Sequence, residues 1–405
     1  MSDLSSPIAS VPRISIQAFC EQMDTHGILA QAVSDRRMSR AHFKLHMGGV
    51  AAAIEAYRDA PTPNLIVIES AGAREELVAQ LDNLAEICDE GTKVVAIGRV
   101  NDILLYRELM ARGVSEYLVH PFDTSDFVRI VSELYNTPGQ RLIGRVIAVT
   151  GTKGGTGAST LAHNLAWTIS RTLEQPTVIV DMDLPFGTAA LDFNQDPPQG
   201  TADAVFASDR LDTNYVERLL SRCTHNLSIM AAPAMLDRNY DLGEDAFEPV
   251  IEFLRGAAPY IVLDLPHGWA GWKRNALIGA DEVVVVAGPD LASLRNAKNI
   301  FDAIRAARPN DLEPRLVLNG IGMAKRPEIP VADFAKALDI APMASILHDP
   351  KLFGTATNNG QMLGEVEGSA KVTEVFAELT RVVTGRPDLK SARRGLFEKI
   401  KDVFA

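Results

Sequence analysis

The chain has 405 residues, of which 46% are hydrophobic and 23% charged, and this composition predicts a folded protein of two or three domains. Its net charge of −12 argues against general nucleic-acid binding, which needs a basic surface. Cys20, Cys88 and Cys223 form no closely spaced pair, so we expect reduced thiols in a cytoplasmic protein. We expect neither a signal peptide nor a membrane-spanning helix, because the sequence contains no suitable apolar run.

The first third of the chain alternates short apolar runs with amphipathic stretches. Residues 1–12, rich in serine and proline, are predicted to form a flexible tail. Over residues 14–135 this alternation predicts five βα units that form a doubly wound parallel sheet. The predicted strands are Ile14–Phe19, His42–Met47, Leu65–Ile68, Lys93–Ile97 and Glu116–Val119. Residues 136–144 contain Pro138 and Gly139, and their composition is typical of a linker.

The segment Tyr117–Phe122 resembles the corresponding part of a response-regulator receiver domain. By that resemblance, Glu69 stands where a receiver has its phosphorylated aspartate, Gly98 replaces a serine or threonine, and His120 replaces a lysine. No acidic metal-binding pair is evident near Cys20-Glu21. Because phosphoryl transfer to a carboxylate needs these groups together, we expect a degenerate receiver-like domain that serves docking or dimerisation. The alternative is that Glu69 mimics a permanently phosphorylated aspartate.

A glycine-rich motif lies between the apolar run Val146–Val149 and the helical stretch Leu161–Ser170. It reads G-T-K-G-G-T-G-A-S-T from Gly151 to Thr160. Glycine backbone N–H groups and the start of a helix form a cradle for phosphate. An ordinary P-loop has a lysine directly before the serine or threonine. Here Ala158 occupies that position, and Lys153 stands early in the loop.

The early lysine makes the motif resemble the deviant P-loop of the ParA/MinD ATPases, and the alanine resembles their pilus-assembly branch, called CpaE or TadZ. The resemblance implies a homodimer in which Lys153 reaches the partner's nucleotide. It implies Mg²⁺ bound by the Ser159 hydroxyl. It also implies ATP bound by Gly154, Gly155, Thr156, Gly157, Ala158, Ser159 and Thr160.

Two further apolar strands end in carboxylates. Asp181 and Asp183 follow the run Thr177–Val180, and Asp264 follows Tyr260–Leu263. Carboxylates at strand ends lie where ligands bind in open α/β sheets, although such residues also cap turns. The resemblance to the family's switch I and Walker B segments implies that Asp181 and Asp264 lie near Mg²⁺. It implies that Asp183 positions the attacking water.

Two more central strands are predicted at Glu282–Ala287 and Arg315–Leu318. By the same resemblance, Asn319 at the end of the second strand reads the adenine, since its amide offers both a donor and an acceptor. Asp349 and Pro350 resemble the loop that closes over the base.

These ordered motifs predict a doubly wound ParA/MinD-like P-loop ATPase domain over residues 145–385. Residues 386–405 form a tail of different composition, predicted to be a basic amphipathic helix. From residue 389 to 405 the tail has five basic and two acidic residues. One helical face is apolar, with Leu396, Phe397, Ile400, Val403 and Phe404. Peripheral membrane contact through residues 389–405 and docking on protein remain equally open.

The full set of motifs implies a Tad/Flp pilus assembly protein that binds ATP and Mg²⁺ and dimerises. It would recruit the secretion ATPase and other Tad proteins at a cell pole, peripherally at the inner membrane. Hydrolysis would be slow or absent, because Ala158 replaces a lysine. One alternative is a ParA/MinD-type DNA-segregation or cell-positioning ATPase, against which Ala158 and the acidic charge argue. Another is a nucleotide-free scaffold, against which the retained Lys153 and aspartates argue.

Overall fold

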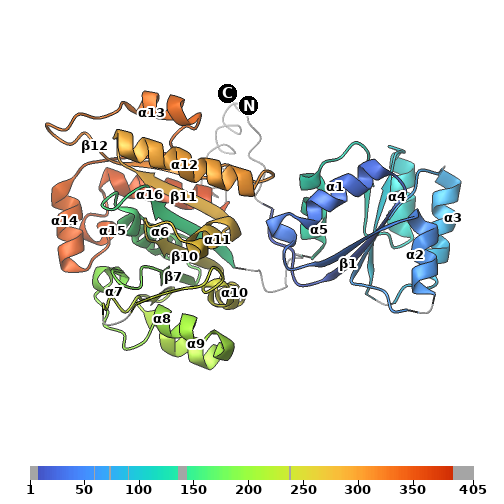
Figure 1. Ribbon diagram of the computed structural model, residues 1–405, viewed down its shortest axis with the longest axis horizontal. Helices are drawn as coiled ribbons and strands as arrows, with labels where there is room; N and C mark the ends of the chain where they lie inside the picture. The colour runs from blue at the N-terminus through green and yellow to red at the C-terminus, as the bar shows by residue number, and fades with distance from the viewer. Residues whose placement is uncertain are drawn as a thin grey trace, which may run out of the picture. The chain divides into compact units, whose positions relative to one another are not determined.

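The computed structural model describes residues 8–385 except positions 59, 73, 90, 136–143 and 237–238. The described chain divides into two compact units, a front unit within Ile8–Leu142 and a back unit that begins at Ile143 (Figure 1). None of the described helices is long and apolar enough to cross a membrane. The predicted C-terminal helix, residues 386–405, and the predicted linker up to residue 143 lie outside the described residues.

The front unit contains a five-stranded parallel sheet in the order β2-β1-β3-β4-β5, which confirms the predicted (βα)₅ fold. Each predicted strand agrees with the structure to within one residue at either end. Helices cover both faces, so β3 is buried along its whole length. The elements are β1 Ser15–Cys20, α1 Met23–Val33, η1 Arg36–Met38, β2 His42–Met47, α2 Gly49–Tyr57, β3 Leu65–Glu69, α3 Arg74–Ala85, β4 Lys93–Gly98, α4 Ile103–Ala111, β5 Glu116–Val119 and α5 Thr124–Tyr135.

Residues 8–12 differ from the predicted flexible tail, because they pack against the front unit. Val11 is fully buried, and its N–H donates to the carbonyl oxygen of Arg37 at 2.8 Å. The hydroxyl of Ser132 donates to the carbonyl oxygen of Ala9 at 2.8 Å. The segment is ordered because two apolar side chains, Ile8 and Val11, join the core under α1 and α5.

The back unit contains an eight-stranded sheet in the order β13-β12-β11-β6-β10-β7-β9-β8. Its strand pairs are parallel except for the short edge pair β8–β9. The elements are β6 Arg145–Gly151, α6 Ala158–Leu173, β7 Thr177–Asp181, α7 Ala189–Asp192, α8 Thr201–Phe206, η2 Ser208–Arg210, α9 Thr213–Leu219, β8 Ser221–Arg222, β9 Leu227–Met230, α10 Glu248–Ala257, β10 Tyr260–Leu265, α11 Gly271–Gly279, β11 Glu282–Ala287, α12 Leu291–Ala307, β12 Arg315–Ile321, α13 Val331–Leu338, β13 Ala344–Leu347, α14 Pro350–Asn359, α15 Leu363–Val366 and α16 Lys371–Thr384.

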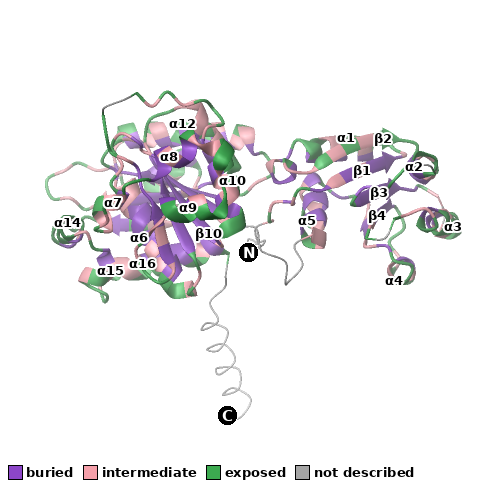
Figure 2. Ribbon diagram, turned by 90° about the horizontal axis from the view of Figure 1, so that it is seen from below, coloured by how far each residue is buried: buried purple, intermediate pink, exposed green. Residues whose placement is uncertain are grey.

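Helices cover both faces of this sheet, as expected for a doubly wound domain. Helices α8 to α13 pack on one face, and α6 with α14, α15 and α16 packs on the other. Figure 2 shows the buried strands at the centre and exposed residues on the outer sides of the helices. The carboxyl ends of β6, β7, β10 and β12 lie at one edge, because these strands run parallel. Ligands bind at this edge in open α/β sheets.

Candidate nucleotide-binding site

The loop between β6 and α6 borders a cavity of about 790 Å³. Gly155 and Gly157 adopt φ angles of 77° and 82°, which favour glycine over residues with a side chain. A Cβ atom on Gly157 would also lie 2.4 Å from the amide nitrogen of Asn319. Ser159 and Thr160 line the cavity from the first turn of α6. Because that turn has N–H groups without intrahelical partners, the geometry suits an anion such as phosphate.

A second cavity of about 360 Å³ shares the lysine and glycines of the loop with the first cavity and extends toward β12 and α14. Asn319, Asp349 and Pro350 all line this second cavity. The structure thus brings the residues predicted to contact the base to one place beside the P-loop. Asp349 also caps α14, since its carboxylate accepts the N–H of Leu352 at 3.0 Å.

The amide of Asn319 connects β12 to the P-loop. Its Nδ2 donates to the carbonyl oxygen of Thr156 at 2.8 Å, and its Oδ1 accepts the N–H of Gly320 at 2.9 Å. One N–H and one lone pair of the amide remain for a ligand. Reading of an adenine by Asn319 therefore stays a prediction that relies on this remaining capacity.

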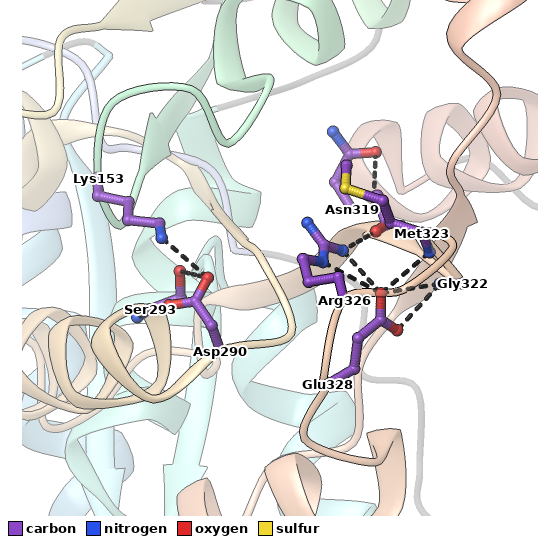
Figure 3. Close-up of polar contacts among 9 residues, drawn as sticks. Lys153, Asp290, Ser293, Asn319, Gly322, Met323, Arg326 and Glu328 are labelled. Atoms are coloured by element: carbon purple, nitrogen blue, oxygen red, sulfur yellow. Dashed lines mark hydrogen bonds and ion pairs between the residues drawn. The ribbon is translucent and has the colours of Figure 1, made fainter.

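Lys153 points toward α12 of its own chain (Figure 3). Its Nζ donates to Oδ2 of Asp290 at 2.9 Å, and Asp290 also caps α12 by accepting the N–H of Ser293 at 2.9 Å. Burial alone would raise the pKa of Asp290, but the bonds from Lys153 and Ser293 lower that pKa below its ordinary value. The side chain of Lys153 is 43% exposed, so the pair lies where a second molecule has access to it.

A second ion pair holds the loop that follows β12. Arg326 pairs with Glu328 at 2.8 Å and also donates to the carbonyl oxygen of Gly320. Glu328 accepts the backbone N–H groups of Gly322 and Met323, at 2.9 and 3.1 Å. Figure 3 shows these contacts side by side with the Lys153–Asp290 pair. The loop is therefore fixed by its own residues next to the second cavity, which Arg326 and Met323 line.

Asp181, the last residue of β7, and Asp183, two residues later, occupy different positions. Asp183 lines the larger cavity, and burial raises its pKa. Asp181 is fully buried, and its two carboxylate oxygens accept the N–H groups of Asp183 at 3.1 Å and Ala189 at 3.0 Å. Burial and the charge of Asp264 raise the pKa of Asp181 to about 7. These two hydrogen bonds hold the loop that carries Asp183 in place. The side chain of Asp181 is not among the residues that line the cavity.

Asp264 at the end of β10 is also buried, and it faces a residue that the sequence analysis did not single out. His163 on α6 is fully buried, with its Nε2 3.3 Å from Oδ2 of Asp264. Its Nδ1 lies 2.7 Å from Oδ2 of Asp192, the last residue of α7. The sequence contained one signal for His163: it is a single histidine within the apolar stretch of the helix that follows the P-loop. Such a residue is informative, because polar residues are seldom fully buried.

Among the described residues, no three acidic, histidine or cysteine side chains form a ready-made metal site. Ser159 and Asp183 line the cavity, whereas Asp181 and Asp264 are buried behind it. Magnesium usually combines one or two protein ligands with phosphate oxygens and water. These residues therefore fit a magnesium ion that enters together with a nucleotide. Ser159 would hold the ion and Asp264 would act through water, and the ion would neutralise phosphate charge.

Lys273 on α11 is a second buried charged residue that the sequence analysis missed. Its side chain is fully buried, and among the described residues its Nζ has no hydrogen-bond partner. The ring of Trp269 is centred 5.9 Å from Nζ. Burial lowers the pKa of Lys273 to about 8.

Replacing Lys273 with methionine is expected to stabilise the protein by about 1–3 kcal/mol near neutral pH, because an unpaired buried ammonium is costly. The unfolded lysine has a pKa of about 10.4, above the folded value. The cost is therefore complete below about pH 8 and disappears as the pH rises toward ~10.4. Thermal melts across this range should show the two proteins converging at high pH. Lys298→Met, on an exposed lysine, is the control; a Lys273→Met protein that melts earlier at neutral pH would contradict this expectation.

The receiver-like corner of the front unit is occupied by its own hydrogen bonds. Glu69 is buried and accepts the N–H groups of Glu21 and Gln22 at 2.8 and 2.9 Å. The Thr25 hydroxyl donates to the same carboxylate at 2.6 Å and lies 2.8 Å from Nε2 of His120. The carboxylate thus already has the donors that a phosphoryl group would need.

Incubation of the protein with a small phosphodonor such as acetyl phosphate is expected to leave the front unit unlabelled. Glu69 is enclosed by three donors, and the groups of receiver chemistry are replaced. Mass spectrometry of digested protein measures the modification, with an ordinary receiver domain as the positive control. Stable phosphate incorporation within residues 14–135 would refute the expectation.

The back unit has the fold of the ParA/MinD class of P-loop proteins, and its glycine-rich loop borders both cavities. Residues 144–317 match the AAA domain family. The septum site-determining protein MinD of Helicobacter pylori is 26% identical over 64% of this chain and 99% of that protein. A ParA family ATPase from Chlorobium tepidum, 22% identical, covers 58% of this chain and 98% of its own with a TM-score of 0.54.

Two further solved structures bear on the chain. MinD of Pyrococcus horikoshii, complexed with Mg-ADP, is 23% identical over 59% of this chain and 96% of its own, with a TM-score of 0.52. The pilus assembly protein CpaE of Caulobacter crescentus is 47% identical over 31% of this chain and 97% of its own, with a TM-score of 0.31. On that sequence identity the chain belongs to the CpaE family, and it carries an ATPase domain of the ParA/MinD type.

Proposed function

We propose that the back unit binds ATP together with magnesium. The phosphates would lie in the larger cavity against the first turn of α6, and the base in the smaller cavity between Asn319 and Asp349. Three features support this: the positive-φ glycines of the loop, the helix start that lines the cavity, and a MinD of the same fold that is complexed with Mg-ADP.

The same proposal includes a homodimer formed through the face that carries the cavities. Large apolar side chains are exposed around this face, which is unusual unless a partner covers them. Their exposed fractions are 67% for Phe186, 72% for Leu191, 53% for Trp269, 73% for Leu291 and 66% for Leu347. In such a dimer Lys153 would exchange Asp290 of its own chain for the partner's nucleotide.

We further propose that the protein acts in Tad/Flp pilus assembly as a polar localisation factor. It would recruit the secretion ATPase and other Tad proteins, at the inner membrane if residues 389–405 bind lipid. The observation that carries this part is the 47% identity to the pilus assembly protein CpaE. The front unit would supply the docking surface. The site that corresponds to the phosphorylated aspartate of a receiver domain is filled by the unit's own hydrogen bonds, so we propose docking as its role instead of phosphorylation.

A cell-positioning ATPase of the ParA/MinD type is the second candidate, favoured by the match to MinD over 64% of this chain. That match leaves the remainder of the chain, including a receiver-like unit, without an assigned purpose. The net charge of −12 also argues against a DNA-segregation motor. The pilus role is therefore the better supported proposal.

A deletion strain of the source organism tests the role in cells. We expect it to lose surface pili and to regain them with the intact gene. Normal piliation with a division or segregation defect would favour the second candidate.

Calorimetry of the purified chain with ATP and ADP, each with and without magnesium, tests the proposed nucleotide site. Absence of binding would overturn the nucleotide proposal.

A further inference from the structure

The imidazole of His267 lies on the wall of the larger cavity. His267 follows the carboxyl end of β10 by two residues. Strand β10 pairs in parallel with β6, with Leu265 opposite Thr150, so the segment after β10 begins beside the start of the glycine-rich loop. Pro266, whose ring fixes its φ angle, precedes the histidine and also lines the cavity. The fold thus places His267 next to the loop.

The nitrogen-bearing edge of this ring faces the loop. A Cβ atom placed on Gly154 would lie 3.6 Å from Cε1, 3.7 Å from Nδ1 and 3.9 Å from Nε2 of His267. Even a neutral imidazole has one N–H donor, so a donor is present here whether or not the ring carries a charge. His267 is exposed, and a ligand that enters the cavity therefore has access to the ring.

Basic groups are scarce on the wall of the larger cavity. Of the described residues that line it, Lys153 and His267 alone carry a basic nitrogen. Lys153 donates to Asp290 at the start of α12, which follows β11, and β11 and β10 lie on opposite sides of β6. Ala158 occupies the position at which an ordinary P-loop has its lysine. His267 is therefore the basic side chain on the β10 side of the loop.

The order of the strands gives the direction of a bound nucleotide. The smaller cavity, proposed for the base, is lined by Asn319 of β12. Along the sheet, β12 is followed by β11, then by β6 with its loop, and then by β10. A phosphate chain that starts at the base and passes the loop therefore points its last phosphate toward β10. ADP is one phosphate shorter and would end at the loop.

We propose that His267 is a specificity-determining residue that donates a hydrogen bond to the terminal phosphate of ATP and so favours the triphosphate over the diphosphate. The inference rests on the proposed nucleotide binding and deepens it by assigning the residue that distinguishes the two nucleotides. In an ordinary P-loop the lysine before the serine or threonine contacts the terminal phosphates. In this chain the donor comes from the segment after β10.

Calorimetry of the full chain with ADP and with a β,γ-imido analogue of ATP, both in magnesium chloride, tests the inference by binding alone. The analogue resists hydrolysis, and the protein is kept at concentrations where light scattering shows a monomer, so dimerisation does not contribute. For His267→Ala we expect the Kd of the analogue to rise about tenfold or more and that of ADP to change less than about twofold, because a hydrogen bond to a charged group is lost only with the triphosphate.

Two further variants separate hydrogen bonding from packing. His267→Gln retains an N–H donor and should keep most of the preference for the analogue. His267→Phe retains a ring without the donor and should behave like His267→Ala. A ring that only packs against the loop would give the reverse order, and both affinities would fall together. His225→Ala, on an exposed histidine of the same unit, should match the wild type.

The outcomes distinguish this inference from the proposed function. Melting temperatures near that of the wild type are expected for all the variants, because the side chain of His267 is exposed. An unchanged ratio of the two Kd values in His267→Ala and His267→Phe, or an equal loss of affinity for both nucleotides, overturns the inference alone. Failure of the wild type to bind either nucleotide overturns both the inference and the proposed function.

Discussion

Lys153→Ala is expected to abolish ATP-dependent dimerisation while leaving the fold and nucleotide binding intact. Lys153 contacts Asp290 through a half-exposed ion pair, and such pairs contribute little to stability. In the proposed dimer, by contrast, its ammonium neutralises phosphate charge of the partner's nucleotide in an interface without water, where the interaction is much stronger. Light scattering of each protein with ATP and magnesium measures the dimer.

Two matched variants separate this effect from general loss of charge. Lys298→Ala removes an exposed lysine of α12 and should dimerise normally. Asp183→Ala should not weaken the dimer, because this carboxylate is proposed to act on water and not on the partner. An ATP dimer that persists undiminished in Lys153→Ala would sink the proposed arrangement.

Ala158→Lys is expected to raise ATP turnover by about 100-fold over a slow or inactive wild type. A lysine at this position stabilises charge that develops on the phosphates during hydrolysis, and loss of one such group typically costs a factor of about 10²–10³. Ala158 lines the larger cavity at the start of α6, so a longer side chain extends toward the proposed phosphates. Phosphate release under saturating ATP measures the change.

Ala158→Met controls for the added volume without the charge and should remain slow. Nucleotide affinity is expected to change less than turnover, since the glycine backbone and the start of α6 already form the cradle. Fast hydrolysis by the wild type would contradict the interpretation of Ala158 as a lost catalytic cation.

The sheet cores could be predicted because their strands are continuous apolar runs. Leu65–Glu69 and Glu282–Ala287 are buried on both faces, and such strands appear in a sequence without any knowledge of their neighbours. The strand Leu227–Met230 and the antiparallel edge strand beside it, Ser221–Arg222, were not predicted. Both segments are too short to show an alternation of apolar and polar residues. They are strands because they pair with each other at the sheet edge.

The candidate site was predictable where it depends on local backbone chemistry. Clustered glycines identify the phosphate-binding loop, and aspartates that follow apolar runs identify the carboxyl ends of strands. The partner of Lys153 could not be found this way, because Asp290 lies 137 residues further along the chain. The contacts of His163 likewise depend on how α6, α7 and β10 pack. The family resemblance implied that Asp181 lies near Mg²⁺, and this assignment stays a prediction. In the structure, the two carboxylate oxygens of Asp181 accept the backbone N–H groups of Asp183 and Ala189.

The packing of residues 8–12 before β1 determines where a stable fragment of the front unit can begin. A fragment that starts at Ser15 would lack Val11, leave an apolar slot open to water, and deprive the carbonyl of Arg37 of its N–H partner. Open slots of this kind promote aggregation. A fragment that starts at residue 8 keeps the slot filled, so the independent folding boundary of this unit lies well ahead of its first strand.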